Sequence, residues 1–130
     1  MNRFGHNFRL AIWGESHGPQ VGIAIDGVPA GLPLAEADFE ADLARRRSGA
    51  PGTTPRREAD RPQIVSGLYA GRTTGAPLTI LFANDDTRPH DYAAPRFRPS
   101  HADWTAHRRF GGHNDPRGGG HFSGRITLAL

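Results

Sequence analysis

Two short apolar runs near the start of the chain constrain its fold most, because with the residues between them they specify a strand, a turn and a second strand. The runs are Phe-Arg-Leu-Ala-Ile-Trp at residues 8–13 and Val-Gly-Ile-Ala-Ile at residues 21–25. Their β-branched and aromatic residues favour strands. The polar stretch between them contains two glycines and a proline, which favour a turn. The simplest connection is a β-hairpin.

Length and composition limit the class of protein. A chain of 130 residues is long enough for one domain with a modest core, so we expect residues 1–130 to be one folding unit or part of one. The chain has no cysteine, which excludes a disulfide framework and thiolate metal sites. No run approaches the roughly 20 apolar residues of a membrane span, so we expect a cytoplasmic protein without a membrane partner.

A helix is predicted around residues 35–43. Ala35, Phe39 and Leu43 recur at helical spacing, although acidic and apolar residues also alternate over residues 36–43, as they would in a strand. High helix propensities, acids in the first turns and arginines in the last favour the helix, and Gly49 provides a stop signal.

The rest of the chain combines strands with long loops. Residues 63–69 and 76–83 indicate two more strands, and residues 50–62 and 84–99 indicate irregular loops. Ser100 is expected to cap a helix over residues 101–110, with Asp103 at the reciprocal capping-box position. Residues 122–130 indicate an apolar helix that lacks a stop signal, so we expect a fragment of a longer protein.

The charged residues indicate an affinity for small anions. All sixteen basic residues are arginine, and the formal net charge is +3. A guanidinium offers paired donors to a carboxylate or phosphate, so this set suits a small polyanion. Nucleic acid would require a one-signed basic stripe, whereas four acids closely precede the Arg45–Arg47 triplet. A nucleic-acid partner is therefore not expected.

The first motif with chemical potential is Gly-Glu-Ser-His-Gly at residues 14–18. It matches the nucleophile elbow of serine hydrolases, in which Ser16 would be the nucleophile. An elbow requires a strand, a sharp turn and a helix, whereas here Pro19 and a second predicted strand follow. The alternative is a tight turn that exposes His17, and the five residues alone do not decide between a functional and a structural histidine.

Two further motifs lie near the end of the chain. In Arg-Pro-Ser-His-Ala-Asp at residues 98–103, His101 would stand in the first turn of a helix, whose dipole disfavours the imidazolium and makes it a better proton donor. Simple capping by Ser100 and Asp103 is the alternative. In the second motif, residues 118–120 are three glycines, which let backbone N–H groups approach a phosphate or the polar edge of a flavin. Flexible connection is the alternative there. The remaining histidines lack metal-ligand spacing, so no metal site is expected.

Taken in order, these segments resemble the sequence blocks of the chorismate synthase family. The resemblance runs from about residue 4 to residue 127 and covers only the first portion of the family's length. Its blocks are Gly-Glu-Ser-His-Gly at 14–18, Asp-Gly-Val-Pro-Ala-Gly at 26–31, Arg-Arg-Arg-Ser-Gly at 45–49, Pro-Arg-Arg-Glu-Ala-Asp at 55–60, Ser-Gly at 66–67, Arg-Pro-Ser-His-Ala-Asp at 98–103 and Arg-Gly-Gly-Gly at 117–120.

The resemblance implies a fold and a reaction. The fold would be α+β, a β-α-β sandwich of antiparallel sheets with helices, in a homotetramer. The reaction would be the elimination of phosphate and a proton from 5-enolpyruvylshikimate 3-phosphate to give chorismate, the last common step of the shikimate pathway, with reduced FMN as cofactor. NADPH is a candidate reductant. By match to the family, His17 would protonate the leaving phosphate and His101 would lie beside the flavin.

The resemblance also implies binding residues. Arg46 matches a position associated with NADP and substrate anions, although Pro51 and Gly52 replace a basic residue usual nearby. The flavin-contacting segment would be His121, Phe122 and Ser123, and the substrate anions would be bound by Arg45, Arg47, Arg98 and Arg125. Other family residues correspond to positions beyond residue 130, so we expect this polypeptide alone to be inactive or unstable. The alternatives are an inactive anion-binding fragment and a serine hydrolase that uses Ser16.

Overall fold

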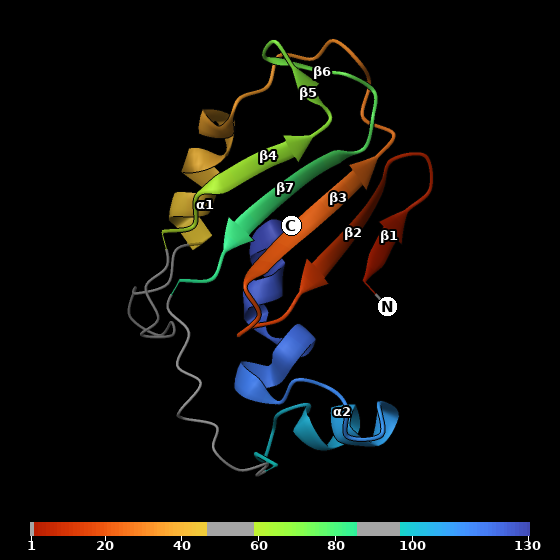
Figure 1. Ribbon diagram of the computed structural model, residues 1–130, viewed down its shortest axis with the longest axis vertical. Coiled ribbons are helices and arrows are strands. Elements are labelled where there is room, and N and C mark those ends of the chain that lie inside the picture. Colours follow the sequence, from red (N-terminus) through yellow and green to blue (C-terminus); the bar gives the residue numbers. More distant parts are fainter. Residues whose placement is uncertain (1, 47–58, 86–96) are drawn as a thin grey trace.

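The computed structural model describes residues 2–46, 59–85 and 97–130. Its centre is a five-stranded sheet, ordered β1-β2-β3-β7-β4, in which all neighbours are antiparallel (Figure 1). Its strands are β1 (Arg3–Gly5), β2 (Arg9–Gly14), β3 (Gln20–Asp26), β7 (Leu78–Ala83) and β4 (Pro62–Ser66).

The predicted β-hairpin is confirmed as β2 and β3. Ile12 pairs with Ile23 and Gly14 with Val21, and on its other side Val21 pairs with Phe82 of β7. Because side chains alternate across a strand, this register brings the apolar residues of β3 and β7 onto one face of the sheet. The same register places the residues just before β3 and just after β7 at one end of the sheet.

The strand predicted over residues 63–69 is wrong in one respect, because the structure divides it. β4 ends at Ser66, and its pairing with β7 shifts between Ile64 and Ser66. The chain then forms a separate two-stranded hairpin from β5 (Leu68–Tyr69) and β6 (Arg72–Thr73). The pairing of β4 with β7 therefore continues past the irregularity only to Ser66 and Thr79. A continuous run of residues with high β-propensity does not reveal this break.

The helix predicted around residues 35–43 is also confirmed, against the strand alternative. It begins as the 3₁₀ helix η1 (Glu36–Phe39) and continues as α1 (Glu40–Arg46). Acids occupy its first turns, and Arg45 and Arg46 occupy the last, which matches the helix dipole. Only Leu43 of this segment is buried, so the helix covers the sheet through a narrow apolar contact.

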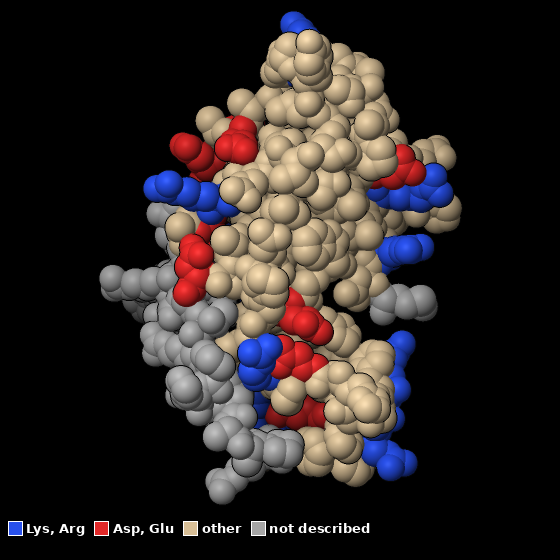
Figure 2. All heavy atoms as spheres, viewed as in Figure 1, with Lys and Arg blue, Asp and Glu red and all other residues tan. Residues whose placement is uncertain are grey.

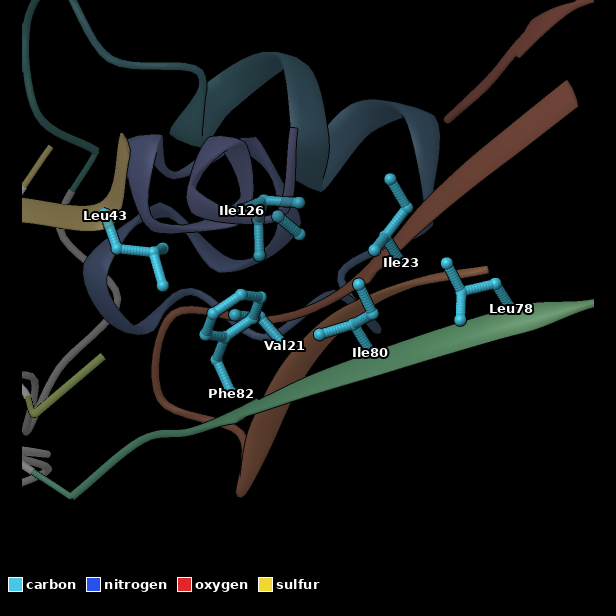
Figure 3. Close-up of a cluster of buried hydrophobic side chains, with 8 residues drawn as sticks. Val21, Ile23, Leu43, Leu78, Ile80, Phe82 and Ile126 are labelled. Carbon is cyan, nitrogen blue, oxygen red and sulfur yellow. The ribbon is translucent and has the colours of Figure 1, made fainter. Parts of the chain in front are cut away.

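The core lies between the sheet and the last helix. The predicted apolar helix forms as the 3₁₀ helix η4 (Gly124–Ala129), which runs behind β3 in Figure 1 and contacts β2, β3 and β7. Figure 3 shows the side chains packed between η4, α1 and the sheet. The buried residues of this cluster are Val21, Ile23, Leu43, Leu78, Ile80, Phe82, Ile126 and Ala129. An antiparallel sheet with helices is the α+β class that the family resemblance implies.

The segment before η4 lies at one end of the sheet. It contains α2 (Asp103–Arg109) and the segment η3 (Arg117–Phe122), which contacts β2 (Figure 1). η3 has 3₁₀ turns interrupted by a kink, because Gly118, Gly119 and Gly120 have non-helical backbone angles. In Figure 2 the middle of the sheet region is uncharged, and charged side chains of both signs lie at its edges and at the end that contains α2. The ion pairs Arg98–Asp103 and Arg117–Asp115 belong to this end. Within the described residues, no helix has the length and apolar character needed to cross a membrane.

Candidate active site

The turn at residues 14–18 joins β2 to β3, and Gly18 N donates to the Glu15 carbonyl at 3.1 Å. Ser16 is only 3% exposed, and its Oγ lies 3.2 Å from Nδ1 of the half-buried His17. Because a strand follows this turn, the strand–turn–helix geometry of a hydrolase nucleophile elbow is not formed. The turn is therefore tight, as one alternative proposed, and it still presents a histidine beside a buried hydroxyl.

The three-glycine segment packs directly against this turn. Ser16 N donates to the Gly120 carbonyl at 3.1 Å. Gly118 has a φ of +57°, and a Cβ built on it would lie 2.5 Å from Ser16 Oγ and 2.7 Å from His17 Cε1. Only glycine combines this left-handed backbone with this close approach at no steric cost. The structure thus brings together two motifs that lie far apart in the sequence.

An ion pair stands beside these two segments. Arg117 Nη2 donates to Asp115 Oδ2 at 2.7 Å, and Arg117 Nε donates to Asp115 Oδ1 at 2.9 Å. These hydrogen bonds lower the pKa of Asp115, against the opposing effect of burial, and the positive charge of His17 contributes a smaller part in the same direction. The pKa of Arg117 is raised chiefly by its hydrogen bond to Asp115. Asp115 is therefore a carboxylate near His17 at neutral pH.

Asn84, which follows the last residue of β7, forms hydrogen bonds to the turn at residues 14–18 and to Pro19. Its Nδ2 donates to the carbonyls of Glu15 at 3.1 Å and Gly18 at 2.8 Å, and its backbone N donates to Pro19 O at 3.0 Å. Sequence reasoning missed this residue and treated it only as the start of a loop. The sequence did contain an indication of its role, because Asn84 is a polar residue directly after the apolar run of β7. Gln20, which follows the β2–β3 turn, pairs with Ala83, so Asn84 lies beside that turn.

Arg125, predicted to bind substrate anions, is engaged within the protein. Its side chain is 10% exposed and pairs through Nη1 with Asp60, whose side chain is 3% exposed. Its Nε donates to Asn84 Oδ1 at 2.8 Å, and its Nη2 donates to the Ala83 carbonyl at 2.9 Å. All three guanidinium nitrogens therefore have protein acceptors. Anion binding by Arg125 stays a prediction.

The predicted flavin-contacting segment forms an aromatic cluster with Phe110. The ring centroids of His121 and Phe122 are 4.0 Å apart, and those of Phe110 and His121 are 5.3 Å apart. Phe122 is 44% exposed, so its ring is partly available to a ligand. Ser123 instead caps η4, because its Oγ accepts from Arg125 N at 3.2 Å.

The expected capping of α2 by Ser100 and Asp103 is wrong. The helix begins at Asp103 with Ala102 as its N-cap, and no side-chain hydrogen bond caps it. Asp103 instead accepts from Arg98 Nε at 2.8 Å and Nη2 at 2.9 Å, and from Arg98 N at 3.0 Å. A charged two-point contact to a guanidinium is stronger than a hydrogen bond to a neutral amide, which explains why the aspartate turns away from the helix.

His101 consequently lies before the helix, on an exposed bend rather than in a first turn. Its Nδ1 lies 3.0 Å from the Pro99 carbonyl. His17, by contrast, lies against the three-glycine segment. The expected roles of His17 as the proton donor to the phosphate and of His101 as a neighbour of the flavin stay predictions.

Arg45 and Arg46, the first two residues of the arginine triplet, lie in the last turn of α1. Arg45 forms an ion pair with Asp42 on the exposed side of the helix, and Arg46 Nη1 donates to the Thr127 carbonyl of η4. Arg47 lies outside the described residues. The anion-binding and NADP roles of this triplet stay predictions. In residues 2–46, 59–85 and 97–130, no three side chains of the metal-binding types lie close enough together to hold a metal ion.

The comparisons with known proteins agree on one family. The family model for chorismate synthase matches residues 8–130. The chorismate synthase of Chitinophaga pinensis is 58% identical over 132 residues, which cover 100% of this chain and 40% of that protein. The chorismate synthase of Aeropyrum pernix is 53% identical over 128 residues, which cover 97% of this chain and 34% of that protein.

A solved structure supports the same assignment. The crystal structure of a chorismate synthase matches 94% of this chain and 30% of the solved chain, with a TM-score of 0.62 and 27% identity. The chain spans 40% and 34% of the length of the two curated relatives described above. Because the family model matches residues 8–130 and the fold of the chain matches a solved member, the chain belongs to the chorismate synthase family.

Proposed function

We propose that this chain supplies the N-terminal part of the active site of a chorismate synthase, which converts 5-enolpyruvylshikimate 3-phosphate to chorismate. The observation that carries this proposal is the packing of the His17 turn against the three-glycine segment, with the Asp115 carboxylate nearby. This packing supports the proposed role of His17 as a proton donor, because it holds the imidazole beside a glycine segment whose backbone a ligand can approach closely. The chain spans less than half of each of these relatives, so the complete reaction is part of the proposal.

The described residues fit reduced FMN, the cofactor that we propose for the reaction. The partly exposed Phe122 ring and the neighbouring His121 ring offer flat surfaces for an aromatic ligand. Gly119 has a φ of +88°, and the nearest atom to a Cβ built on it is 4.0 Å away, so a ligand can approach this backbone closely. Reduced FMN, when bound, lends electron density to the allylic system from which phosphate leaves.

His17 is proposed as the proton donor to the leaving group. In the elimination the carbon–oxygen bond to phosphate breaks, and its electron pair leaves with the phosphate. A ring carbon gives its proton to a base, and the electrons of that C–H bond remain in the ring as part of the new conjugated double bonds. An imidazole changes charge near neutral pH, so it can donate to the departing phosphate oxygen and be reprotonated afterwards. The Asp115 carboxylate attracts the protonated ring, and the Ser16 hydroxyl at Nδ1 orients it.

The arginines are proposed to bind the two carboxylates and the phosphate of the substrate. Arg45 has a side chain that is 73% exposed, and its surface ion pair with Asp42 contributes little, so it can exchange that partner for a substrate anion. The same role is proposed for Arg46, Arg47 and Arg98. His101 beside the flavin, NADPH as a reductant that contacts Arg46, a homotetramer and a cytoplasmic location are proposed from the family resemblance alone.

A hybrid enzyme tests the proposed function. Residues 1–130 of this chain are joined to the C-terminal remainder of the Chitinophaga pinensis relative, and chorismate and phosphate are measured without oxygen in the presence of reduced FMN. We expect chorismate at a rate within about tenfold of the unaltered relative. His17→Ala should lower kcat about 100-fold, because a positioned general acid typically contributes that much or more. The matched control is His6→Ala, which removes an exposed imidazole and should leave kcat unchanged.

Three outcomes oppose this proposal. A hybrid enzyme that folds and binds FMN without forming chorismate would favour the inactive anion-binding fragment, as would phosphate binding with no preference for flavin. A His17→Ala variant with unaltered kcat would remove His17 from the reaction. For the 130-residue chain alone we propose no turnover, and phosphate release by that chain with reduced FMN would contradict this.

A further inference from the structure

Asn84 stands where β7 ends, and it is buried with 9% of its surface exposed. Its amide nitrogen donates to Glu15 O at 3.1 Å and to Gly18 O at 2.8 Å. These two carbonyls flank Ser16 and His17, so one side chain holds both sides of the turn that carries the candidate proton donor. Its backbone N, which donates to Pro19 O at 3.0 Å, adds a third attachment to the same segment.

The orientation of this amide is fixed by Arg125. Arg125 Nε donates to Asn84 Oδ1 at 2.8 Å, which requires that the oxygen face the guanidinium and the nitrogen face the turn. The guanidinium is itself held by the Asp60 carboxylate and by the Ala83 carbonyl. A buried arginine with a carboxylate partner has little freedom to move. A chain of hydrogen bonds therefore connects Asp60, through Arg125 and Asn84, to the turn that carries His17.

We propose that Asn84 is a positioning residue, which acts on the reaction only through His17, and that Arg125 serves to orient Asn84. This inference rests on the proposed function of His17 as the proton donor to the leaving phosphate. A general acid must lie within hydrogen-bond reach of the atom that it protonates, and a misplacement of about 1 Å can cost about 100-fold in rate. Without Asn84 the turn keeps its sequence and loses its fixed position against Gly118.

The variant Asn84→Asp tests this inference in the hybrid enzyme. It keeps the size and the acceptor for Arg125, but it removes both donors and turns an oxygen towards the carbonyls of Glu15 and Gly18. We expect kcat to fall about 30-fold and KM to change by less than about threefold, because the substrate-binding groups stay in place.

The matched control is Thr73→Val. Thr73 is 5% exposed, donates to Pro29 O at 2.6 Å and accepts from Leu32 N at 2.9 Å, so it also holds a loop by buried hydrogen bonds. That loop follows β3, at the opposite end of the strand from the His17 turn. Thr73→Val should lower stability without changing kcat. An equal loss of kcat in Thr73→Val and Asn84→Asp would overturn the inference.

A double variant distinguishes positioning from general weakening of the enzyme. In the presence of His17→Ala, the further change Asn84→Asp should lower kcat by less than about twofold, because the group that it positions is already gone. Additive losses in the double variant would overturn the inference, since Asn84 would then act independently of His17.

Hydrogen exchange in the hybrid enzyme gives a readout that does not depend on turnover. Ser16 N donates to Gly120 O and Gly18 N donates to Glu15 O, so both amides report on the turn. We expect Asn84→Asp to accelerate their exchange about tenfold relative to amides in β3, and Thr73→Val to leave that ratio unchanged. Unchanged or uniformly faster exchange in Asn84→Asp would overturn the inference. An inactive parent hybrid enzyme with locally faster exchange would instead reject the proposed function while Asn84 still holds the turn.

Discussion

Two aspartates near the candidate active site are each paired with an arginine close by in the sequence. Asp103 is held by Arg98, and Asp115 is held by Arg117, each through two guanidinium nitrogens. Hydrogen bonds from Arg98 lower the pKa of Asp103 from 3.8 to about 2, although burial opposes the shift. Each pair neutralises charge locally, so these arginines are less available to a substrate anion than their number in the sequence indicates.

Replacement of Arg98 by glutamine should raise the pKa of Asp103 towards its ordinary value. A carboxylate whose pKa is lowered by folding stabilises the protein above its unfolded pKa, and that stabilisation is lost as the pH falls from about 4 towards 2. At neutral pH, Arg98→Gln should therefore lower the free energy of unfolding by about 1 kcal/mol. The effect is this small because the Arg98 side chain is 34% exposed and solvent screens the ion pair. Carboxyl-carbon NMR titration of Asp103 checks the pKa, and an unaltered value in Arg98→Gln would contradict the assignment.

Some helices and strands of this chain can be predicted from local sequence patterns, and others cannot. The hairpin and the helix around residues 35–43 are predictable because both depend on neighbours in the sequence. The N-terminus of α2 is not predictable in this way, because Ser100 and Asp103 fit the capping-box pattern. Arg98 competes with the helix amides for the Asp103 carboxylate, and this can be recognised only from the folded geometry. The docking of the three-glycine segment on the His17 turn joins residues far apart in the chain, so no local pattern predicts it.

Substitutions in the three-glycine segment test this docking. Gly118→Ala and Gly119→Ala both place a side chain at positive φ, +57° and +88°, and each should lose about 1–2 kcal/mol of stability from backbone strain. Only at Gly118 would the new Cβ meet Ser16 and His17. Gly118→Ala should therefore lower kcat of the hybrid enzyme about 100-fold and Gly119→Ala much less. Equal kcat values in the two variants would show that the contact has no effect on the reaction.

At the scale of the whole molecule, one apolar cluster unites the sheet, α1 and η4. Ile126 is 2% exposed within it, and Leu43 and Phe82 reach the same cluster from α1 and β7 (Figure 3). The apolar character of these residues is evident from the sequence. Which of them meet is not, because the meeting depends on the strand order β1-β2-β3-β7-β4.

Truncation of Ile126 tests the contribution of this cluster. Ile126→Ala removes buried methyl and methylene groups and leaves a cavity, so the free energy of unfolding should fall by about 2–5 kcal/mol. Leu130→Ala is the control, because Leu130 is 56% exposed and its truncation should change stability by less than about 0.5 kcal/mol. Urea unfolding followed by tryptophan fluorescence measures both variants. Similar midpoints for the two would show that η4 does not hold the sheet.

The support of the His17 turn by Asn84, Gly118 and Gly120 has a consequence for the order of assembly. Synthesis on the ribosome delivers the turn long before the glycines that complete its surroundings. Such contacts between distant positions form late, because a long stretch of chain must first lose its freedom. The hairpin can therefore form early, while the histidine that it carries gains a fixed orientation only in the final stage of folding. Nascent chains that stop before residue 118 lack η4, so they would display the β2–β3 hairpin without the complete apolar cluster or an organised candidate active site.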